Sequence, residues 1–141
     1  MEPRLSLVTL AVDDLAAARA FYARLGWREA AMSNAQIAFF DLGGVGLALF
    51  GRVALAADAG VDAAGTGFRG VTLAHNVRSP AAVDATLADA VAAGGRRVKP
   101  GAATGWGGYA GYFADPDGHL WEVAHNPLAP LDEAGRLQLG A

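Results

Sequence analysis

The chain has no cysteine, few charged residues and no extended basic segment. Without cysteine there can be no disulfide, no thiolate metal site and no cysteine nucleophile. Only 18 % of the 141 residues are charged, the net charge is −3, and no basic run exceeds the pair Arg96-Arg97. Because nucleic-acid binding requires a basic surface, we expect no nucleic-acid partner.

Long apolar runs are missing as well. No stretch approaches the length of a transmembrane helix, and the N-terminal Met-Glu-Pro-Arg lacks the cationic region and cleavage site of a secretory signal. We therefore expect a cytoplasmic protein with no membrane partner. The 53 % of hydrophobic residues suffices, at this length, for one domain with a buried core. The excess of arginine over lysine, with abundant alanine and glycine, is typical of a bacterial protein.

The first half of the chain predicts one helix among four strands. Apolar residues recur at three- and four-residue spacing between Asp13 or Asp14, which can cap a helix, and Gly26, which can end one. Short apolar runs on either side predict strands over residues 5–12, 27–32, 37–42 and 45–50. The expected order of elements in this first module, residues 5–50, is βαβββ.

The second half repeats this order. Residues 71–74 have the same letters as residues 8–11, and Ser79-Pro80 begins a second helical pattern that ends at Gly94-Gly95. A strand near residues 96–99 and a hairpin complete a second βαβββ module, residues 69–126. Residues 51–68, rich in Ala, Gly and Asp, form a connector with room for helix. Residues 127–141 form a tail, and we expect its leucines to pack against the surface of the domain: Leu128, Leu131, Leu137 and Leu139. The predicted fold is α+β, built from two βαβββ modules.

The hairpin at residues 109–124 is the most informative local feature. Asp115-Pro-Asp-Gly118 is a strong turn signal, and aromatic residues on both sides favour strands. If Asp115 and Gly118 end the two strands, Gly111 faces Glu122. The period of two then places five residues on one face, with Tyr112 and Trp121 on the other: Tyr109, Gly111, Phe113, Leu120 and Glu122.

Glu122 is the main candidate for chemistry, because a carboxylate among apolar groups and opposite a glycine has room for a ligand. It could act as a general base or accept a hydrogen bond from a ligand hydroxyl or amine, and burial would raise its pKa. The alternative is a structural carboxylate bonded to the backbone or to a neighbouring tyrosine. Trp106 and Tyr109, interleaved with glycines, could line a pocket or belong to the core.

The three histidines are weaker candidates. His119 and His125 have the opposite strand parity to Glu122, so we expect them to face away from it. His75 sits at the end of a strand, where a polar side chain needs no catalytic role.

Three segments resemble the vicinal oxygen chelate superfamily, the group of glyoxalase I, bleomycin-resistance proteins and extradiol dioxygenases. They are Val8-Thr-Leu-Ala-Val-Asp-Asp-Leu15, Phe21-Tyr22 with Leu25-Gly26, and Phe113-Ala-Asp-Pro-Asp-Gly-His-Leu-Trp-Glu122. The resemblance implies two βαβββ modules whose curved mixed sheet surrounds a cleft, commonly in a homodimer. On that basis we expect Thr9, Ala48 and Thr72 to line the cleft with the hairpin residues.

The metal ligands implied by the resemblance are largely missing. Leu7 stands where metal enzymes of the superfamily have a first-strand histidine. The matching position in the second module is Gly70 or Thr72. Ala48 stands where a carboxylate is common in the fourth strand. Glu122 alone occupies a ligand position. Because a catalytic zinc or iron site needs about three protein ligands, we expect no tightly bound metal and no other cofactor.

The sequence leaves three classes of function open. The first is a metal-independent protein that binds a small aromatic or polar molecule. The second is a lyase, isomerase or dioxygenase of the superfamily, with Glu122 as general base or metal ligand. The third is a dimeric structural or regulatory domain with a vestigial cleft.

Overall fold

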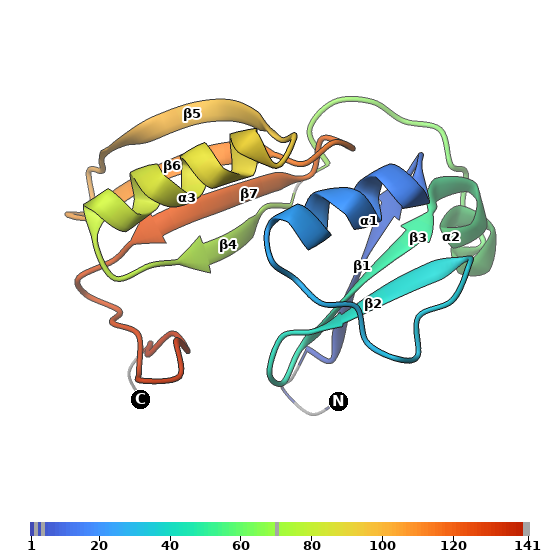
Figure 1. Cartoon of the computed structure of the whole chain (residues 1–141), viewed down its shortest axis with the longest axis horizontal. Coiled ribbons are helices and arrows are strands. Elements are labelled where there is room, and N and C mark those ends of the chain that lie inside the picture. Colours follow the sequence, from blue (N-terminus) through green and yellow to red (C-terminus); the bar gives the residue numbers. More distant parts are fainter. Residues whose placement is uncertain (2, 4, 70, 140–141) are drawn as a thin grey trace. The chain divides into compact units, whose positions relative to one another are not determined.

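The computed structural model describes residues 1, 3, 5–69 and 71–139. The chain divides into two units, Met1–Arg69 and Gly70–Ala141, and each combines a mixed β-sheet with helices (Figure 1). The α+β fold expected from the sequence is thereby confirmed. None of the helices in the described part of the chain is both long and apolar enough to cross a membrane.

The first unit is a three-stranded sheet with helix α1 packed on one face. Its strands are β1 (Leu7–Val12), β2 (Ile37–Asp41) and β3 (Gly46–Gly51), in the order β1-β3-β2, with β1 parallel and β2 antiparallel to β3. Helix α1 (Leu15–Arg24) begins where the Asp14 side chain accepts a hydrogen bond from the Ala17 amide, as an N-cap should. Its Phe21 and Tyr22 are fully buried, and Tyr22 packs on Phe40 of β2.

The predicted strand over residues 27–32 is wrong. The Trp27 ring packs against Tyr22 and Phe40, with ring centroids 5.2 and 5.8 Å away, which holds the segment near the helix end. The Ser33 amide closes a turn on the Ala30 carbonyl. One backbone hydrogen bond, from the Ala30 amide to the Phe39 carbonyl at 2.7 Å, joins this segment to β2. Aromatic packing has therefore displaced strand pairing here.

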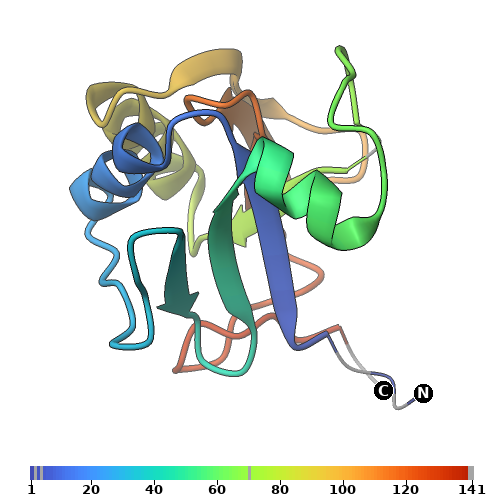
Figure 2. The same ribbon diagram turned by 90° about the vertical axis from the view of Figure 1, so that its right-hand side faces the viewer.

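The connector contains a helix, as its composition allowed. Helix α2 (Arg52–Ala59) follows β3 directly and ends at Gly60, whose left-handed backbone (φ 71°) closes the last turn. Figure 2 shows α2 beside β1.

The second unit is a four-stranded sheet in the order β4-β7-β6-β5. Its strands are β4 (Leu73–Asn76), β5 (Arg96–Ala103), β6 (Tyr109–Ala114) and β7 (Leu120–His125), and only β4 and β7 run parallel. Helix α3 (Pro80–Ala92) is capped by the Ser79 hydroxyl, which accepts a hydrogen bond from the Ala82 amide. The helix buries Val83, Leu87 and Ala90.

The tail is folded back on the second unit. The Arg78 guanidinium donates hydrogen bonds to the Leu131 and Asp132 carbonyls, at 3.2 and 2.6 Å, and Leu131 forms an isolated β-bridge with Leu137. Ala129 is buried, but Leu128 and Leu139 are each 80 % exposed. The expectation that these two leucines pack on the surface is wrong, because hydrogen bonds from Arg78 rather than leucine burial hold the tail.

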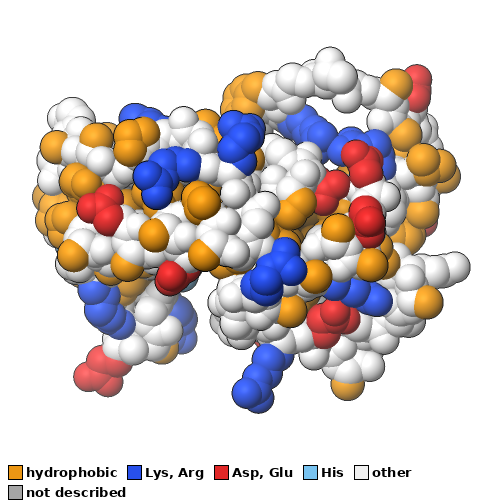
Figure 3. Space-filling model, turned by 45° about the horizontal axis from the view of Figure 1, so that its top comes forward, with side chains coloured by type: hydrophobic (Ala, Val, Ile, Leu, Met, Phe, Trp, Pro, Cys, Tyr) orange, Lys and Arg blue, Asp and Glu red, His pale blue; other side chains and the backbone are white. Residues whose placement is uncertain are grey.

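On the face drawn in Figure 3, charged side chains of both signs lie on each unit. Lys and Arg are scattered there among Asp, Glu and apolar groups.

Candidate functional site

The two faces of the second sheet can be told apart at Gly111. A Cβ added to this glycine would lie 2.6 Å from Leu87 Cδ1 of α3, so Gly111 faces the helix and the backbones approach closely there. Paired residues share a face and successive residues alternate. Residues on the α3 face therefore include Tyr109, Gly111, Phe113, Trp121, Val123 and His125. We call the opposite side the Glu122 face; it carries Ala74, Asn76, Ala110, Tyr112, Ala114, Leu120, Glu122 and Ala124.

The predicted hairpin register is wrong by one residue. Glu122 pairs with Tyr112, not with Gly111, and Phe113 pairs with Trp121, not with Leu120. Tyr109, Gly111 and Phe113 therefore do not share a face with Glu122, whereas Leu120 does.

The cause of this shift is Asp115, which sequence reasoning treated only as a turn residue. Its backbone amide donates to the His119 carbonyl, and its Oδ1 accepts hydrogen bonds from the Asp117 and His119 amides at 3.0 and 2.9 Å. The carboxylate is only 3 % exposed. Because these bonds draw His119 into the loop, the second strand starts one residue later than a four-residue turn would allow.

Glu122 and Tyr112 form the central pair of the Glu122 face. Both are half-buried. Partial burial, the negative charge of Glu122 and a hydrogen bond to its carboxylate, in that order, raise the pKa of the Tyr112 phenol. The raised pKa favours the protonated phenol beside the Glu122 carboxylate. A carboxylate can accept several hydrogen bonds, so this contact leaves capacity for a ligand.

Small side chains surround this pair. On β4 the residue beside Glu122 is Ala74, which is exposed. Along the same face lie the buried alanines Ala110, Ala114 and Ala124. At the centre of this face the polar groups are thus one carboxylate and one phenol, and the side chains around them are alanine methyl groups.

The aromatic residues expected beside Glu122 serve other roles. Phe113 and Trp121 stack with centroids 6.1 Å apart in the core under α3. The Tyr109 hydroxyl lies 3.2 Å from both carboxylate oxygens of Asp84 on α3. Removal from water, and secondly the neighbouring Asp84 carboxylate, raise the pKa of Tyr109. Trp106 is 45 % exposed at the β5–β6 turn, folded over Gly108.

In the first unit, Thr9 and Ala48 are cross-strand neighbours on the face away from α1. Their position matches the prediction that they lie together, although it does not test a ligand role. Thr72 lies just before β4 and is exposed, and Gly70 lies outside the described residues.

The register also corrects the internal equivalence of the two units. Ala11 pairs with Phe50, and Ala74, its counterpart in the four-residue repeat, pairs with Glu122. The position equivalent to Glu122 is therefore Phe50, whereas Ala48 corresponds to Leu120. The equivalent of Tyr112 is Ile37.

The histidines lie apart from the pair. His75 and His125 belong to the α3 face, and His119 lies in the β6–β7 loop. Partial removal from water lowers the pKa of His75, which favours its neutral form. The His125 Nδ1 lies 3.4 Å from the Val77 carbonyl.

The donor set does not suit a divalent metal. The cross-strand neighbours of Glu122 are Ala74 and Tyr112, neither of which is a usual ligand, and its counterpart in the first unit is Phe50. In the part of the chain that the structure describes, no three His, Asp or Glu side chains are grouped so that they could hold a metal ion. The residues around Glu122 therefore do not fit a catalytic metal ion.

A hollow of about 560 Å³ lies in the first unit, between α2 and residues 61–69. Its lining is mostly alanine, valine and phenylalanine. Two of its charged groups already have partners: Arg52 Nε is 2.7 Å from Asp13 Oδ1, and Asp62 Oδ1 accepts from the Ala64 amide.

Comparison with solved structures gives close matches over the whole chain. A glyoxalase-related enzyme from Fulvimarina pelagi is 38 % identical, with 99 % of each chain covered and a TM-score of 0.87. A glyoxalase/bleomycin resistance protein/dioxygenase from Nocardioides is 28 % identical, covering 99 % of this chain and 91 % of that one, with a TM-score of 0.72. Lactoylglutathione lyase from Agrobacterium tumefaciens is 25 % identical, covering 88 % and 94 %, with a TM-score of 0.66.

No curated protein matches the chain. The family model described as Glyoxalase/Bleomycin resistance protein/Dioxygenase superfamily matches residues 4–123. This span covers nearly all of the first unit and the second unit as far as the residue after Glu122. The chain belongs to the glyoxalase/bleomycin resistance protein/dioxygenase superfamily.

Proposed function

We propose that the protein binds a small organic molecule that donates a hydrogen bond or an ammonium group to Glu122. The observation that supports this most is the cross-strand pairing of Glu122 with Tyr112 on the Glu122 face. It places the carboxylate beside a phenol and among small side chains. The proposed contacts are Glu122, Tyr112 and Leu120, with Ala74 leaving space beside them.

The chemistry of the pair favours a ligand with a donor at one end. Glu122 supplies acceptor oxygens, and the Tyr112 oxygen keeps lone pairs after donating its proton. A hydrogen bond to a charged group contributes about 1.5–3 kcal/mol, more than a neutral one. An amine therefore fits this face better than a carboxylate, which Glu122 would repel.

A second candidate function is catalysis with Glu122 as general base. The Glu122 carboxylate lies beside Tyr112, and its oxygens could take a proton from a bound substrate. Two of the similar structures carry names of enzymes, a glyoxalase-related enzyme and a lactoylglutathione lyase. A lyase or isomerase step at Glu122 is thus the alternative to simple binding.

We propose further that neither function uses a tightly bound metal. The support is the donor set: one carboxylate beside Ala74 and Tyr112. Elemental analysis of protein purified without chelators should give far less than one zinc, nickel or iron per chain. About one equivalent of any of them, or a strong rise in melting temperature with micromolar metal, would refute the proposal.

We propose a homodimer as the working assembly. Each sheet has two edge strands, β1 and β2 in one and β4 and β5 in the other, and exposed edges favour association. Light scattering at micromolar concentration should give twice the chain mass, and the mass of one chain would overturn the proposal.

Benzylamine is a suitable first probe, because it joins an ammonium group to a flat apolar ring. In calorimetric titrations we expect Glu122→Gln to weaken its binding more than about tenfold, since the charge is lost at constant volume. Glu133→Gln, the same change on an exposed tail residue, is the matched control and should bind like the parent. Equal affinity in parent and Glu122→Gln would refute the binding site. If hits from a wider screen are converted to product and only turnover is lost in Glu122→Gln, the enzyme is favoured.

A further inference from the structure

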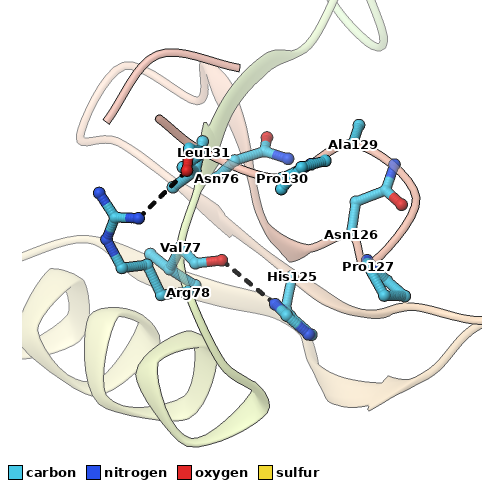
Figure 4. A pocket seen from close by; sticks show the side chains of 9 residues that line it. All are labelled: Asn76, Val77, Arg78, His125, Asn126, Pro127, Ala129, Pro130 and Leu131. Carbon is cyan, nitrogen blue, oxygen red and sulfur yellow. Dashed lines mark hydrogen bonds between the residues drawn. The ribbon is translucent and has the colours of Figure 1, made fainter. Parts of the chain in front are cut away.

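A pocket of about 270 Å³ lies at the ends of β4 and β7, where the tail folds back (Figure 4). Its walls come from three segments: the end of β4 and the link to α3, the end of β7, and the tail. The lining residues are Asn76, Val77, Arg78, His125, Asn126, Pro127, Ala129, Pro130 and Leu131. Ligand pockets of drug-sized molecules start near 300 Å³, so this one suits a single functional group or ring.

The pocket begins next to the proposed ligand site. Asn76 pairs with Ala124 and lies on the Glu122 face, two residues beyond Ala74, the neighbour of Glu122. With a strand spacing of about 4.8 Å and a rise of about 6.6 Å over two residues, the Cα atoms of Glu122 and Asn76 should be about 8 Å apart. Ala74 on β4 lies beside Glu122 and two residues before Asn76, and its small side chain is exposed, whereas Ala124 on β7 is buried. A flat ligand could span this distance over Ala74 without meeting a bulky side chain.

The wall formed by the tail is fixed rather than loosely placed. Arg78 donates to the Leu131 and Asp132 carbonyls from the β4–α3 link. The Val77 amide donates to the Ala124 carbonyl at 2.8 Å, and the Ala129 amide to the Asn126 carbonyl at 3.3 Å. Ala129 itself is buried. Figure 4 shows the Asn76 and Asn126 side chains pointing to the side where Ala129 and Pro130 lie, away from the His125 ring.

Two carboxamides here have unused hydrogen-bonding capacity. Asn76 is half-buried, and no hydrogen bond from its side chain to another described residue is found. Asn126 Oδ1 accepts from the Leu128 amide at 2.9 Å, which leaves its NH₂ group available. A carboxamide offers a donor and an acceptor side by side. Its natural complement is another group of that kind, such as an amide or a lactam.

We infer that this pocket receives the far end of an elongated ligand, whose near end is held by Glu122. Asn76 is the residue that selects a carboxamide-like group at the far end. Arg78 acts as a positioning residue, because it fixes the tail wall without needing to touch the ligand. The inference rests on the proposed function, since it takes the Glu122 site as the first anchor.

A pair of probes separates the two anchors. Benzylamine can reach only Glu122, whereas 4-(aminomethyl)benzamide carries the same ammonium group and a carboxamide across a rigid ring. We expect the parent to bind the benzamide about five- to tenfold more tightly, as one or two added neutral hydrogen bonds would give. Asn76→Leu, similar in size but apolar, should abolish that advantage and leave benzylamine binding unchanged. Arg78→Gln should reduce the advantage and also speed hydrogen exchange at the tail amides of residues 131–133.

The outcomes distinguish the inference from the function beneath it. If both probes bind equally well, or if Asn76→Leu retains the benzamide advantage, the inference is wrong while a loss on Glu122→Gln still supports the Glu122 site. If Glu122→Gln changes neither affinity, the proposed function fails and the inference fails with it. Loss of both affinities in Asn76→Leu, with the melting temperature of the parent retained, would also contradict the selective role of Asn76.

Discussion

The two units have the same frame but opposite chemistry on the sheet faces turned away from α1 and α3. In the first unit the matching row across three strands is Ala11, Phe50 and Ile37; in the second it is Ala74, Glu122 and Tyr112. The backbone pairing is the same in both, parallel on one side and antiparallel on the other. One frame thus carries an apolar row and the other an acid beside a phenol. The fold supplies the position, and two residues supply the chemistry.

The cores differ in a second way. In the first unit the helix-facing pair on β2 and β3 is Ala38 and Leu49, and the buried aromatic rings are Phe21 and Tyr22 of α1 with Phe40 of β2. In the second unit the equivalent strand pair is Phe113 and Trp121, and α3 buries Val83, Leu87 and Ala90. The helix thus buries aromatic rings in the first unit and aliphatic side chains in the second. Close packing is conserved while the element that provides the large side chains is not.

The largest expected effect concerns this core. Trp121→Ala should lower the free energy of unfolding by about 3–5 kcal/mol, because a ring that is 6 % exposed and stacked on Phe113 leaves a cavity. Leu49→Ala, the equivalent change in the first unit, should cost about 2–5 kcal/mol. Denaturant titration measures both, and hydrogen exchange should show the Trp121 effect first in residues 71–139. A loss below 1 kcal/mol for Trp121→Ala would contradict the proposed packing.

The next effect concerns the two hairpin turns. Asp115→Ala removes a buried carboxylate that accepts from two amides, and we expect a loss of about 1–3 kcal/mol because those donors lose their partner. Asp41→Ala is the control: Asp41 Oδ1 accepts from the Gly43 amide but is exposed, so its loss should stay near 0.5 kcal/mol. Equal losses in thermal or denaturant unfolding would show that the two turns do not differ as described.

The smallest effect concerns pH. The pKa of Tyr112 is raised in the folded chain, so its contribution to stability is complete below about pH 10, the ordinary tyrosine pKa, and is lost as pH rises through the folded value. Tyr112→Phe should therefore make the free energy of unfolding less dependent on pH above that point. Tyr109, whose pKa is also raised, should account for the pH dependence of the free energy of unfolding that remains in Tyr112→Phe. Unchanged pH dependence in Tyr112→Phe would mean that Tyr112 does not donate to Glu122.

Much of the fold could be predicted from local signals. Asp14, Ser79 and Pro80 mark the helix starts because capping acts within three residues, and the four-letter repeat identifies β1 and β4 as counterparts. The packing of the Trp27 ring could not be predicted, because Phe40 is distant in the sequence and is brought next to Trp27 only by the fold.

The site was predicted less well than the fold. Glu122 follows from its place after the turn, but its neighbours depend on register, and register depends on how Asp115 bonds to the loop amides. A shift of one residue moves every side chain to the other face. The sequence signal that could have revealed it is an aspartate at the start of an Asp-Pro-Asp-Gly turn, whose side chain can bond to amides two and four residues ahead.

The most direct test of the account is a crystal structure of the protein with benzylamine. The account predicts the ammonium nitrogen within hydrogen-bonding distance of the Glu122 carboxylate, the ring against the alanines of the Glu122 face, and the Tyr112 hydroxyl still bonded to Glu122. A bound ammonium group paired with another acid, or a ring bound elsewhere with Glu122 untouched, would contradict the central claim that this face carries the ligand chemistry.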